Sequence, residues 1–287
     1  MIDIKKLLKV EGEIVNRWLD RLLPSESQPP VSLHTAMRYS VFAGGKRLRP
    51  ILCKMAFERF GGEGERIYPP ACALEMIHTY SLIHDDLPCM DDDDLRRGKP
   101  TSHVKFGEAM AILAGDALHA IAFENLAKSG DIRVVADVAR AIGTEGLVGG
   151  QVFDLEAEGG VPTAETLERI HRGKTGALIA TSLRAGALIA GASDEDVEKV
   201  SIYGEKLGLA FQIIDDILDI IADESALGKP IGSDAERDKA TYPCLYGIDE
   251  SRRLAEKLVR EAKEALGAEV ANEKLFAIAD FIHERMF

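Results

Sequence analysis

The apolar residues of this 287-residue chain recur at intervals of three and four along most of its length. This spacing places them on one side of an α-helix, and no segment alternates apolar and polar residues as a half-buried strand does. The predicted helices are separated by Gly, Pro or Asp, with one break at Gly149-Gly150. They cover residues 3–23, 33–43, 50–60, 69–86, 108–128, 131–148, 164–172, 175–190, 194–222, 242–267 and 271–285. We therefore expect an all-α bundle of roughly ten or more helices, and a single domain over residues 1–287 because no long polar linker divides the chain.

Composition limits the class of protein. Hydrophobic residues make up 46% of the chain, which is enough for a large core without a structural metal or disulfides. The four cysteines form no CxxC pair, so we expect free thiols and a cytoplasmic location. The N-terminal segment is charged throughout and does not resemble a signal peptide. No apolar run reaches the roughly 18 residues of a membrane span, so we expect no membrane insertion.

The chain is acidic, with 35 basic and 48 acidic residues and a net charge of −13. Nucleic-acid binding depends on Lys and Arg that neutralise phosphates, so we expect no nucleic-acid partner. A polybasic membrane anchor is excluded for the same reason. Residues 109–127 and 176–192 are apolar nearly all round the helix, which predicts burial in the core, a contact between subunits, or both.

One acidic cluster lies inside the apolar run 209–221 without a turn. Asp215 and Asp219 are four residues apart and share a helix face, about 5–6 Å apart at Cβ, whereas Asp216 lies on a neighbouring face. Two carboxylates about 4 Å apart repel by roughly 4 kcal/mol at an effective dielectric constant near 20, so a cation should offset the repulsion. Oxygen ligands without a nearby Cys and His set favour Mg²⁺ or Mn²⁺ over zinc.

A second acidic cluster, residues 84–94, directly follows a predicted apolar helix. Pro88 must end or bulge that helix, because it lacks an N–H and clashes with the preceding turn. Helical spacing therefore cannot relate Asp85 to Asp91, and residues 92–94 can simply be solvated. Mg²⁺ is usually held by one or two carboxylates together with substrate phosphates. Two such clusters predict a clamp for metal ions and a diphosphate.

Short basic motifs stand out in this acidic chain. They lie at residues 44–50, 95–100 and 173–176, with Lys229 and Lys239 further along. Glycine lets the backbone approach an anion closely, and the guanidinium of Arg matches phosphate oxygens. Each motif alone is a weak signal. Together with the acidic clusters they predict a pocket for two polyanions, one held through metal and one held directly by Arg and Lys.

These motifs resemble, in kind and order, those of the trans-isoprenyl diphosphate synthases, the polyprenyl synthetase family. Residues 85–103 are similar to the first aspartate-rich motif in its bacterial form, and residues 211–219 to the second. The segments GGKRLRP, GKTG and KPIGSDAERDKATYP complete the set. The resemblance covers essentially the whole chain and implies helices around a deep central cavity, usually in a homodimer. It also implies about three Mg²⁺ ions, for which Mn²⁺ can substitute.

The resemblance also implies which residues form the site. Asp85 and Asp91 would hold metal ions on one side of the allylic diphosphate and Asp215 a further ion, with Asp86 and Asp219 in support. The residues that would contact the allylic substrate are Arg96, Lys174, Thr175, Gln212, Lys229 and Lys239. Those that would hold isopentenyl diphosphate without metal are Lys46, Arg49, His78 and Arg97.

The implied reaction joins isopentenyl diphosphate head to tail to dimethylallyl and geranyl diphosphate. The allylic C–O bond ionises, and metal ions and lysines stabilise the departing diphosphate. The isopentenyl double bond then attacks the allylic carbon, and in the family the departed diphosphate takes the proton. An apolar cavity keeps water away from the cation. The residues expected to carry catalysis are Asp85, Asp86, Asp91, Asp215, Lys174 and Lys229.

Two residues before the first motif bear on product length. In the bacterial-type family an aromatic residue at the position of Tyr80 resembles farnesyl diphosphate synthases, and Ser81 follows it. One extra methylene in a filled site costs about 1–3 kcal/mol, so a tyrosine ring can block further elongation. We therefore expect (E,E)-farnesyl diphosphate as product, with a geranylgeranyl diphosphate synthase of the same family as the alternative.

Three other functions are weighed against this one. A metal phosphohydrolase could use the His84-Asp85 pair, but it leaves the second acidic motif and GGKRLRP without a role. A class I terpene cyclase shares the first motif and needs no isopentenyl diphosphate. A non-catalytic partner subunit would not need intact aspartates in both motifs.

Overall fold

The computed structural model describes residues 2–157, 163–221 and 241–285. The chain forms two compact units, and each is described by itself. The first unit comprises Lys5–Ile51 and Gly64–Ile132, and the second comprises Met1–Ile4, Leu52–Glu63 and Arg133–Phe287. A single domain over residues 1–287 stays a prediction.

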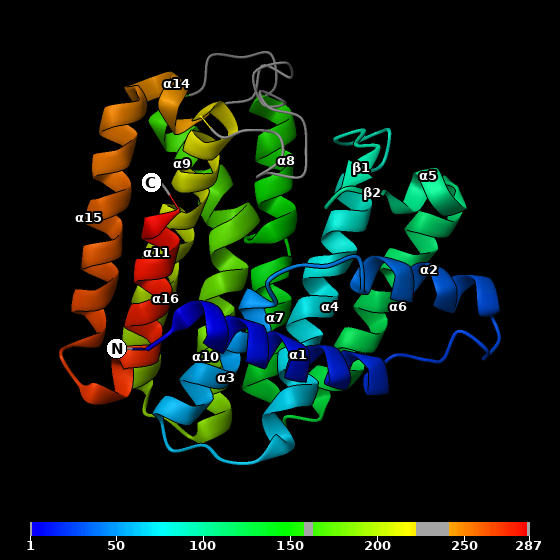
Figure 1. Ribbon diagram of the computed structural model, residues 1–287, viewed down its shortest axis with the longest axis horizontal. Coiled ribbons are helices and arrows are strands. Elements are labelled where there is room, and N and C mark those ends of the chain that lie inside the picture. Colours follow the sequence, from blue (N-terminus) through cyan, green and yellow to red (C-terminus); the bar gives the residue numbers. More distant parts are fainter. Residues whose placement is uncertain (1, 158–162, 222–240, 286–287) are drawn as a thin grey trace. The chain divides into compact units, whose positions relative to one another are not determined.

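The first unit is built around two long helices, α4 and α6, which lie side by side (Figure 1). Two prolines in the first turn start α4, where a missing N–H costs nothing, and Tyr68 stacks on Trp18 with ring centroids 5.1 Å apart. Most residues of α4 are buried, as its apolar sequence predicts. The elements of the unit are α1 (Ile4–Leu22), α2 (Val31–Val41), the 3-10 helix η1 (Glu65–Ile67), α4 (Tyr68–Asp85), β1 (Leu95–Arg96), β2 (Lys99–Pro100), α5 (Ser102–Phe106) and α6 (Glu108–Ala127).

The second unit packs α10 and α15 against the long helix α11 (Figure 1). The buried hydroxyl of Tyr203 on α11 donates to the carbonyl oxygen of Leu275 at 2.7 Å and so fixes α16. The elements are most of α3 (Leu48–Arg59), α7 (Ile132–Ile142), α8 (Leu147–Ala157), α9 (Ala164–His171), the π-helical turn η2 (Arg172–Gly176), α10 (Ala177–Ala190), α11 (Asp194–Ile221), α14 (Tyr242–Tyr246), α15 (Ile248–Leu266), the 3-10 helix η3 (Val270–Asn272) and α16 (Glu273–Glu284).

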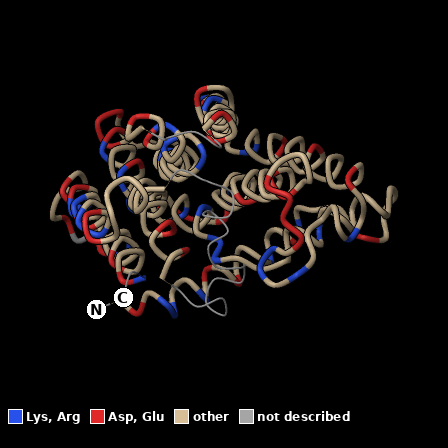
Figure 2. The backbone as a smooth tube through the Cα atoms, turned by 90° about the horizontal axis from the view of Figure 1, so that it is seen from above, with Lys and Arg blue, Asp and Glu red and all other residues tan. Residues whose placement is uncertain are grey.

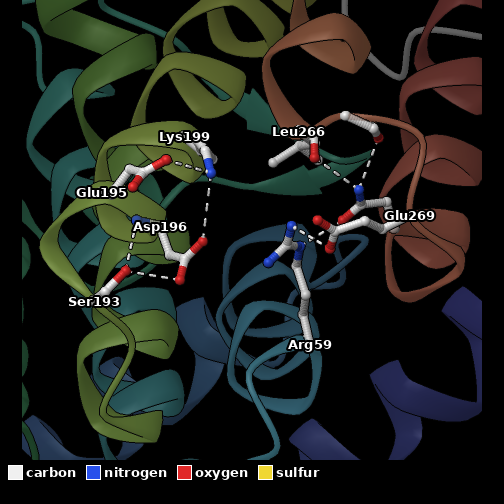
Figure 3. Close-up of polar contacts among 9 residues, drawn as sticks. Arg59, Ser193, Glu195, Asp196, Lys199, Leu266 and Glu269 are labelled. Atoms are coloured by element: carbon white, nitrogen blue, oxygen red, sulfur yellow. Dashed lines mark hydrogen bonds and ion pairs between the residues drawn. The ribbon is translucent and has the colours of Figure 1, made fainter.

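Polar side chains secure two helix ends of the second unit (Figure 3). At the start of α11 the Asp196 N–H donates to Ser193 Oγ at 3.2 Å, and the Ser193 hydroxyl donates to Asp196 Oδ2 at 2.8 Å. This reciprocal cap satisfies donors that the first helical turn leaves free. Arg59 of α3 pairs with Glu269 at 3.3 Å, next to η3. Charges of both signs are interspersed along the described helices, so the acidic excess is not confined to one element (Figure 2).

The all-α expectation is confirmed, but the predicted helices 131–148 and 242–267 are wrong as single helices, because the first ends at Ile142 and the second is interrupted at Gly247. Among the described residues the only β structure is the antiparallel pair of two-residue strands β1 and β2. The predicted break at Gly149-Gly150 is wrong, because both glycines lie within α8. Gly150 is needed for the close packing of α8 on η2, because a Cβ there would meet the backbone of η2.

One helix bears on the expectation of no membrane insertion, which stays a prediction. Among the described helices, α6 is long and apolar enough to cross a membrane by length and composition. Its acidic residues, Glu108, Asp116 and Glu124, interrupt the apolar sequence, but the mean hydropathy of the helix stays as high as that of a membrane span. One such helix is weak evidence for membrane insertion, because core helices of globular proteins reach the same length and composition.

Candidate active site

The first acidic motif folds back on the end of α4. The helix ends at Asp85, three residues before Pro88, as the sequence predicts. The N–H of Asp91 donates to the carbonyl oxygen of Asp85 at 2.8 Å, so the turn brings the backbones of these two residues together. Asp92 adopts φ 49°, a left-handed conformation that Asp tolerates in tight turns. The fold thus provides the proximity of Asp85 and Asp91 that helical spacing could not predict.

Asp86 has a different environment from Asp85. It is buried and accepts hydrogen bonds from both Nε and Nη2 of Arg96, the former at 2.9 Å. Arg96 also donates to Asp93 Oδ2 at 3.0 Å. Burial raises the pKa of Asp86, and the opposing effect of Arg96 does not cancel this rise. Burial lowers the pKa of Arg96, but Asp86, Asp93 and Asp85 outweigh it and raise the pKa overall. Asp86 therefore orients Arg96 within the motif.

A cluster of arginines surrounds His78. Burial holds the pKa of His78 well below its usual value, and the nearby arginines lower it further in the order Arg49, Arg97, Arg96 and Arg47. His78 is therefore neutral near pH 7. Four residues were predicted to hold isopentenyl diphosphate. Three of them interact electrostatically, Arg49 and Arg97 each with His78. The fourth, Lys46, is exposed and lies three residues before Arg49 in the sequence.

The glycine pair of GGKRLRP makes room for Arg97. Nη1 of Arg97 donates to the carbonyl oxygen of Gly44. Gly45 has φ +114°, and a Cβ there would lie 2.6 Å from Cζ of Arg97. Only glycine allows both the conformation and the close approach. Arg47 of the same motif has a structural role, because it is buried and donates to Glu75 Oε1 at 2.8 Å.

Tyr80 lies in an aromatic group between α4 and α6. Its ring centroid is 4.9 Å from that of His119 and 5.8 Å from that of His84. Burial raises the pKa of Tyr80 to about 12, and Asp85 adds to the rise. Ser81 is buried, and its hydroxyl donates to the carbonyl oxygen of His78 at 3.0 Å. The chain-length roles of Tyr80 and Ser81 stay predictions.

The environment of His84 disfavours the phosphohydrolase hypothesis. Its Nε2 lies 3.2 Å from the carbonyl oxygen of Ile112. A Cβ on Gly115 would lie 2.2 Å from Nε2, so the ring packs directly on the α6 backbone. His84 is therefore a packing residue between α4 and α6.

The second acidic motif lies on α11 in the second unit. Asp216 is buried and accepts hydrogen bonds from the Tyr242 N–H at 3.1 Å and from Gln212 Nε2 at 3.2 Å. The Thr175 hydroxyl donates to Gln212 Oε1 at 2.8 Å. The motif thus connects two predicted substrate residues, Thr175 and Gln212, in one hydrogen-bonded chain. Asp219 is buried as well, and its supporting role stays a prediction.

Lys174 is held by a carboxylate that sequence reasoning missed. Its Nζ donates to Asp154 Oδ2 of α8 at 2.8 Å. Lys174 lies in the π-helical turn η2, a local widening that often marks functional sites. A Cβ on Gly150 would lie 2.4 Å from the Lys174 backbone nitrogen, so glycine is required there. A polar Gln151 and Asp154 in the otherwise apolar segment 147–155 were the available signal.

His171 was also missed in the sequence. Its Nε2 lies 3.7 Å from Asp216 Oδ2. Burial lowers the pKa of His171 to about 3, with Asp154 opposing and Lys174 adding to the decrease. The ring is therefore neutral near pH 7. Lys229 and Lys239, which were predicted to contact the allylic substrate, lie outside the described residues.

The carboxylates fit magnesium by chemistry. In the described ranges no group of three or more His, Cys, Asp and Glu side chains forms a complete metal site. Mg²⁺ does not require one, because one or two carboxylates hold it and water and substrate phosphates complete its shell. Asp215 already accommodates a cationic group, since Arg285 Nη2 lies 2.8 Å from its Oδ1. Asp85 and Asp91 in the first unit, and Asp215 in the second, carry the hard carboxylate oxygens that Mg²⁺ prefers.

Comparison with known proteins now gives the family. The polyprenyl synthetase family model matches residues 30–276. The chain belongs to the polyprenyl synthetase family. A geranylgeranyl diphosphate synthase of Cyanophora paradoxa is 51% identical over 282 residues, which cover 95% of this chain and 93% of that protein. A second relative is the chloroplastic heterodimeric geranylgeranyl pyrophosphate synthase large subunit 1 of Arabidopsis thaliana. It is 48% identical over 297 residues, which cover 99% of this chain and 80% of that protein.

A solved structure agrees with the family fold. The apo crystal structure of an FPP/GFPP synthase from Zymomonas mobilis matches with a TM-score of 0.87 and 38% identity, over 98% of this chain and 99% of that one. Membership of this family confirms the expected class, a prenyltransferase with prenyl diphosphate substrates. The narrower expectation of a farnesyl diphosphate synthase is not confirmed, because similar relatives are named geranylgeranyl synthases.

Proposed function

We propose that this polyprenyl synthetase condenses isopentenyl diphosphate with allylic diphosphates to give geranylgeranyl diphosphate. The observation that carries the proposal is the identity of about 50% to proteins named geranylgeranyl synthases. The arrangement of residues within each unit supports the reaction class. The first unit gathers His78 and its arginines beside the first acidic motif. The second unit joins Lys174 and Thr175 to the second acidic motif through Asp154 and Gln212.

The allylic half of the reaction needs stabilisation of a departing diphosphate. Mg²⁺ held by Asp85 and Asp91 in the first unit, and Mg²⁺ held by Asp215 in the second, would each stabilise negative charge that develops on a diphosphate. Lys174 supplies a positive charge whose position Asp154 fixes. Thr175 is hydrogen-bonded to Gln212, which is in turn hydrogen-bonded to Asp216, and its hydroxyl would contact the diphosphate. These residues orient the diphosphate without a protein nucleophile.

The isopentenyl half needs a metal-free anion site. Arg49 and Arg97 provide guanidinium groups, and the neutral ring of His78 adds a donor without adding charge. Burial lowers the pKa of Arg97, Glu75 opposes this, and Arg47 lowers it further, but the group stays charged near pH 7. An incoming diphosphate would relieve the repulsion among these arginines. The site therefore favours a dianionic or trianionic ligand.

Farnesyl diphosphate is the second candidate for the product. Tyr80 is 9% exposed and packed against His119, at a position where an aromatic residue resembles farnesyl synthases. This observation favours farnesyl diphosphate, whereas the named relatives favour geranylgeranyl diphosphate. We give precedence to the relatives, because a single position decides less than identity over nearly the whole chain.

We also propose a homodimer. Leu113 and Ile112 on α6 are 54% and 43% exposed, and Val148 and Val152 on α8 are similarly exposed. Exposed apolar residues that gather on a helix often meet a partner. Each unit has such a helix, and a second copy of the chain is the occupant that the family resemblance implies.

Chromatography of the products tests the proposed function. Purified chain is incubated with Mg²⁺, isopentenyl diphosphate and dimethylallyl diphosphate, and the products are dephosphorylated and separated by chain length. Geranylgeraniol as the main alcohol supports the proposal, and farnesol supports the second candidate. In a separate incubation with farnesyl diphosphate and Mg²⁺ but no isopentenyl diphosphate, release of a hydrocarbon and diphosphate would indicate a terpene cyclase. No turnover in either incubation would indicate a non-catalytic subunit.

A further inference from the structure

The side chain of Arg285, just after α16, lies on the second acidic motif. Its Nη2 forms an ion pair with Asp215 Oδ1 at 2.8 Å, and its Cζ lies 5.0 Å from the ring centroid of Phe211. Phe211 and Asp215 are four residues apart, so both lie on one side of α11. Nη1 of Arg285 is buried and has no hydrogen-bond partner within the part of the chain that the structure describes.

The packing of helix α16 fixes the position of the backbone from which the Arg285 side chain extends. Leu275, Ile278 and Ile282 are buried, and the Tyr203 hydroxyl holds the Leu275 carbonyl oxygen. The N–H of Arg285 donates to the Ile282 carbonyl oxygen at 3.3 Å, so the residue continues directly from the packed helix. Its side chain is only 20% exposed, against 35% for Asp215. The contact is therefore part of the packed structure of the second unit.

We propose that Arg285 is the counter-cation of Asp215 in the metal-free enzyme, and that a divalent ion bound with diphosphate displaces it from Oδ1. The inference rests on the proposed function, in which Asp215 holds Mg²⁺. Asp215, Asp216 and Asp219 repel one another within two helical turns, and Arg285 offsets that repulsion while no metal is bound. A metal ion at the same carboxylate repels the guanidinium, so the two cations compete. Arg285 is thus a positioning residue.

Binding of Mn²⁺ in the presence of inorganic pyrophosphate tests the proposal, with free Mn²⁺ measured by electron paramagnetic resonance. Arg285→Ala should bind Mn²⁺ about 3- to 10-fold more tightly, as expected for loss of a half-buried competing ion pair. The metal-free variant should melt at a lower temperature than the wild type, and its melting temperature should rise more on addition of Mn²⁺ and pyrophosphate. Arg285→Lys should restore most of the wild-type affinity.

A matched control removes another arginine of the second unit. Arg260 on α15 is 67% exposed and lies 3.8 Å from Glu264, so Arg260→Ala should leave Mn²⁺ binding unchanged. In an Asp215→Asn background, Arg285→Ala should have no further effect on Mn²⁺ affinity, because the shared carboxylate is absent.

Two results would overturn the inference, and they are distinguishable. Unchanged or weaker Mn²⁺ binding by Arg285→Ala, with binding still weakened by Asp215→Asn, would remove the role of Arg285 alone. If Asp215→Asn bound Mn²⁺ and pyrophosphate as tightly as the wild type, the metal role of Asp215 in the proposed function would fail as well.

Discussion

The aspartates of the two motifs divide into two kinds by burial. Asp86 and Asp216 are 3% exposed and satisfied by protein donors, Arg96 for one and Gln212 with the Tyr242 N–H for the other. The side chain of Asp215 is 35% exposed. A buried carboxylate with protein donors orients its neighbours, whereas a more exposed one can accept a metal ion at lower desolvation cost. This difference supports the proposal that Asp215 is a metal ligand and that the buried aspartates have supporting roles.

Asp85→Asn tests the first motif. Loss of one charge on a metal ligand should lower kcat/KM by roughly 100- to 1000-fold, comparable to removal of one preorganised electrostatic group. Steady-state kinetics at several Mg²⁺ concentrations measures this effect. Asp92→Asn is the matched control, because Asp92 is an exposed residue of the same turn and should change kcat/KM by less than about threefold. Equal losses in both variants would contradict the assignment.

Tyr80→Ala tests the chain-length residue. Removing the ring opens space between α4 and α6, so the product should become longer by one or more isoprene units. Product chromatography measures this, with circular dichroism to confirm folding, because loss of a buried aromatic ring costs about 3–5 kcal/mol. Tyr68→Ala removes a tyrosine from the other end of α4 and should leave product length unchanged. An unchanged distribution for Tyr80→Ala would exclude this residue as a determinant.

At the scale of elements, the sequence predicts helices better than the contacts between them. The end of α4 before Pro88 follows from proline chemistry alone. The break predicted at Gly149-Gly150 fails because glycine there serves close packing: Gly150 contacts the backbone of Lys174. The Lys174–Asp154 pair joins residues of two different helices, and no local spacing indicates which helices meet.

Gly208→Ala tests the packing of α11 on η2. A Cβ at Gly208 would lie 2.7 Å from the Gly176 Cα, so the turn that carries Lys174 and Thr175 must shift. The variant should lose about 1–3 kcal/mol of unfolding free energy and show a higher KM for the allylic substrate. Urea denaturation and steady-state kinetics measure the two effects.

The control for that variant is Gly12→Ala on α1. A Cβ at Gly12 would lie 4.0 Å from Arg47 Cγ, which is ordinary van der Waals contact, so a methyl group fits there. Alanine in such a helical position should stabilise the protein by about 0.5–1 kcal/mol. If Gly208→Ala behaved like Gly12→Ala, the contact between α11 and η2 would not position the site.

At the scale of the whole molecule, the order of the motifs predicts the family, but product length does not follow from it. Proteins that resemble this chain over nearly its whole length have names that give different products. In our proposal, product length depends on the space around Tyr80, and sequence spacing does not measure that space. The Tyr80 ring packs on His119 of α6, so a residue far away in the sequence would also shape it.

Leu113→Lys tests the proposed dimer. Leu113 is 54% exposed on α6, and a charge placed in an apolar interface should shift the protein toward monomer. Light scattering after gel filtration should give the mass of two chains for the wild type and of one chain for the variant at low micromolar concentration. Ala127→Lys adds the same charge at the exposed end of α6 and should remain dimeric. A monomeric wild type with full turnover would contradict the dimer.

The central claim is that an allylic diphosphate ionises to a carbocation before isopentenyl diphosphate attacks. The most direct measurement is the single-turnover rate with geranyl diphosphate that carries fluorine beside the reacting carbon. Fluorine withdraws electrons and destabilises the cation, so condensation should slow by at least about 100-fold, roughly 2.7 kcal/mol in the barrier, while analogue binding stays unchanged. An unchanged single-turnover rate would show that no cation forms and would contradict the account.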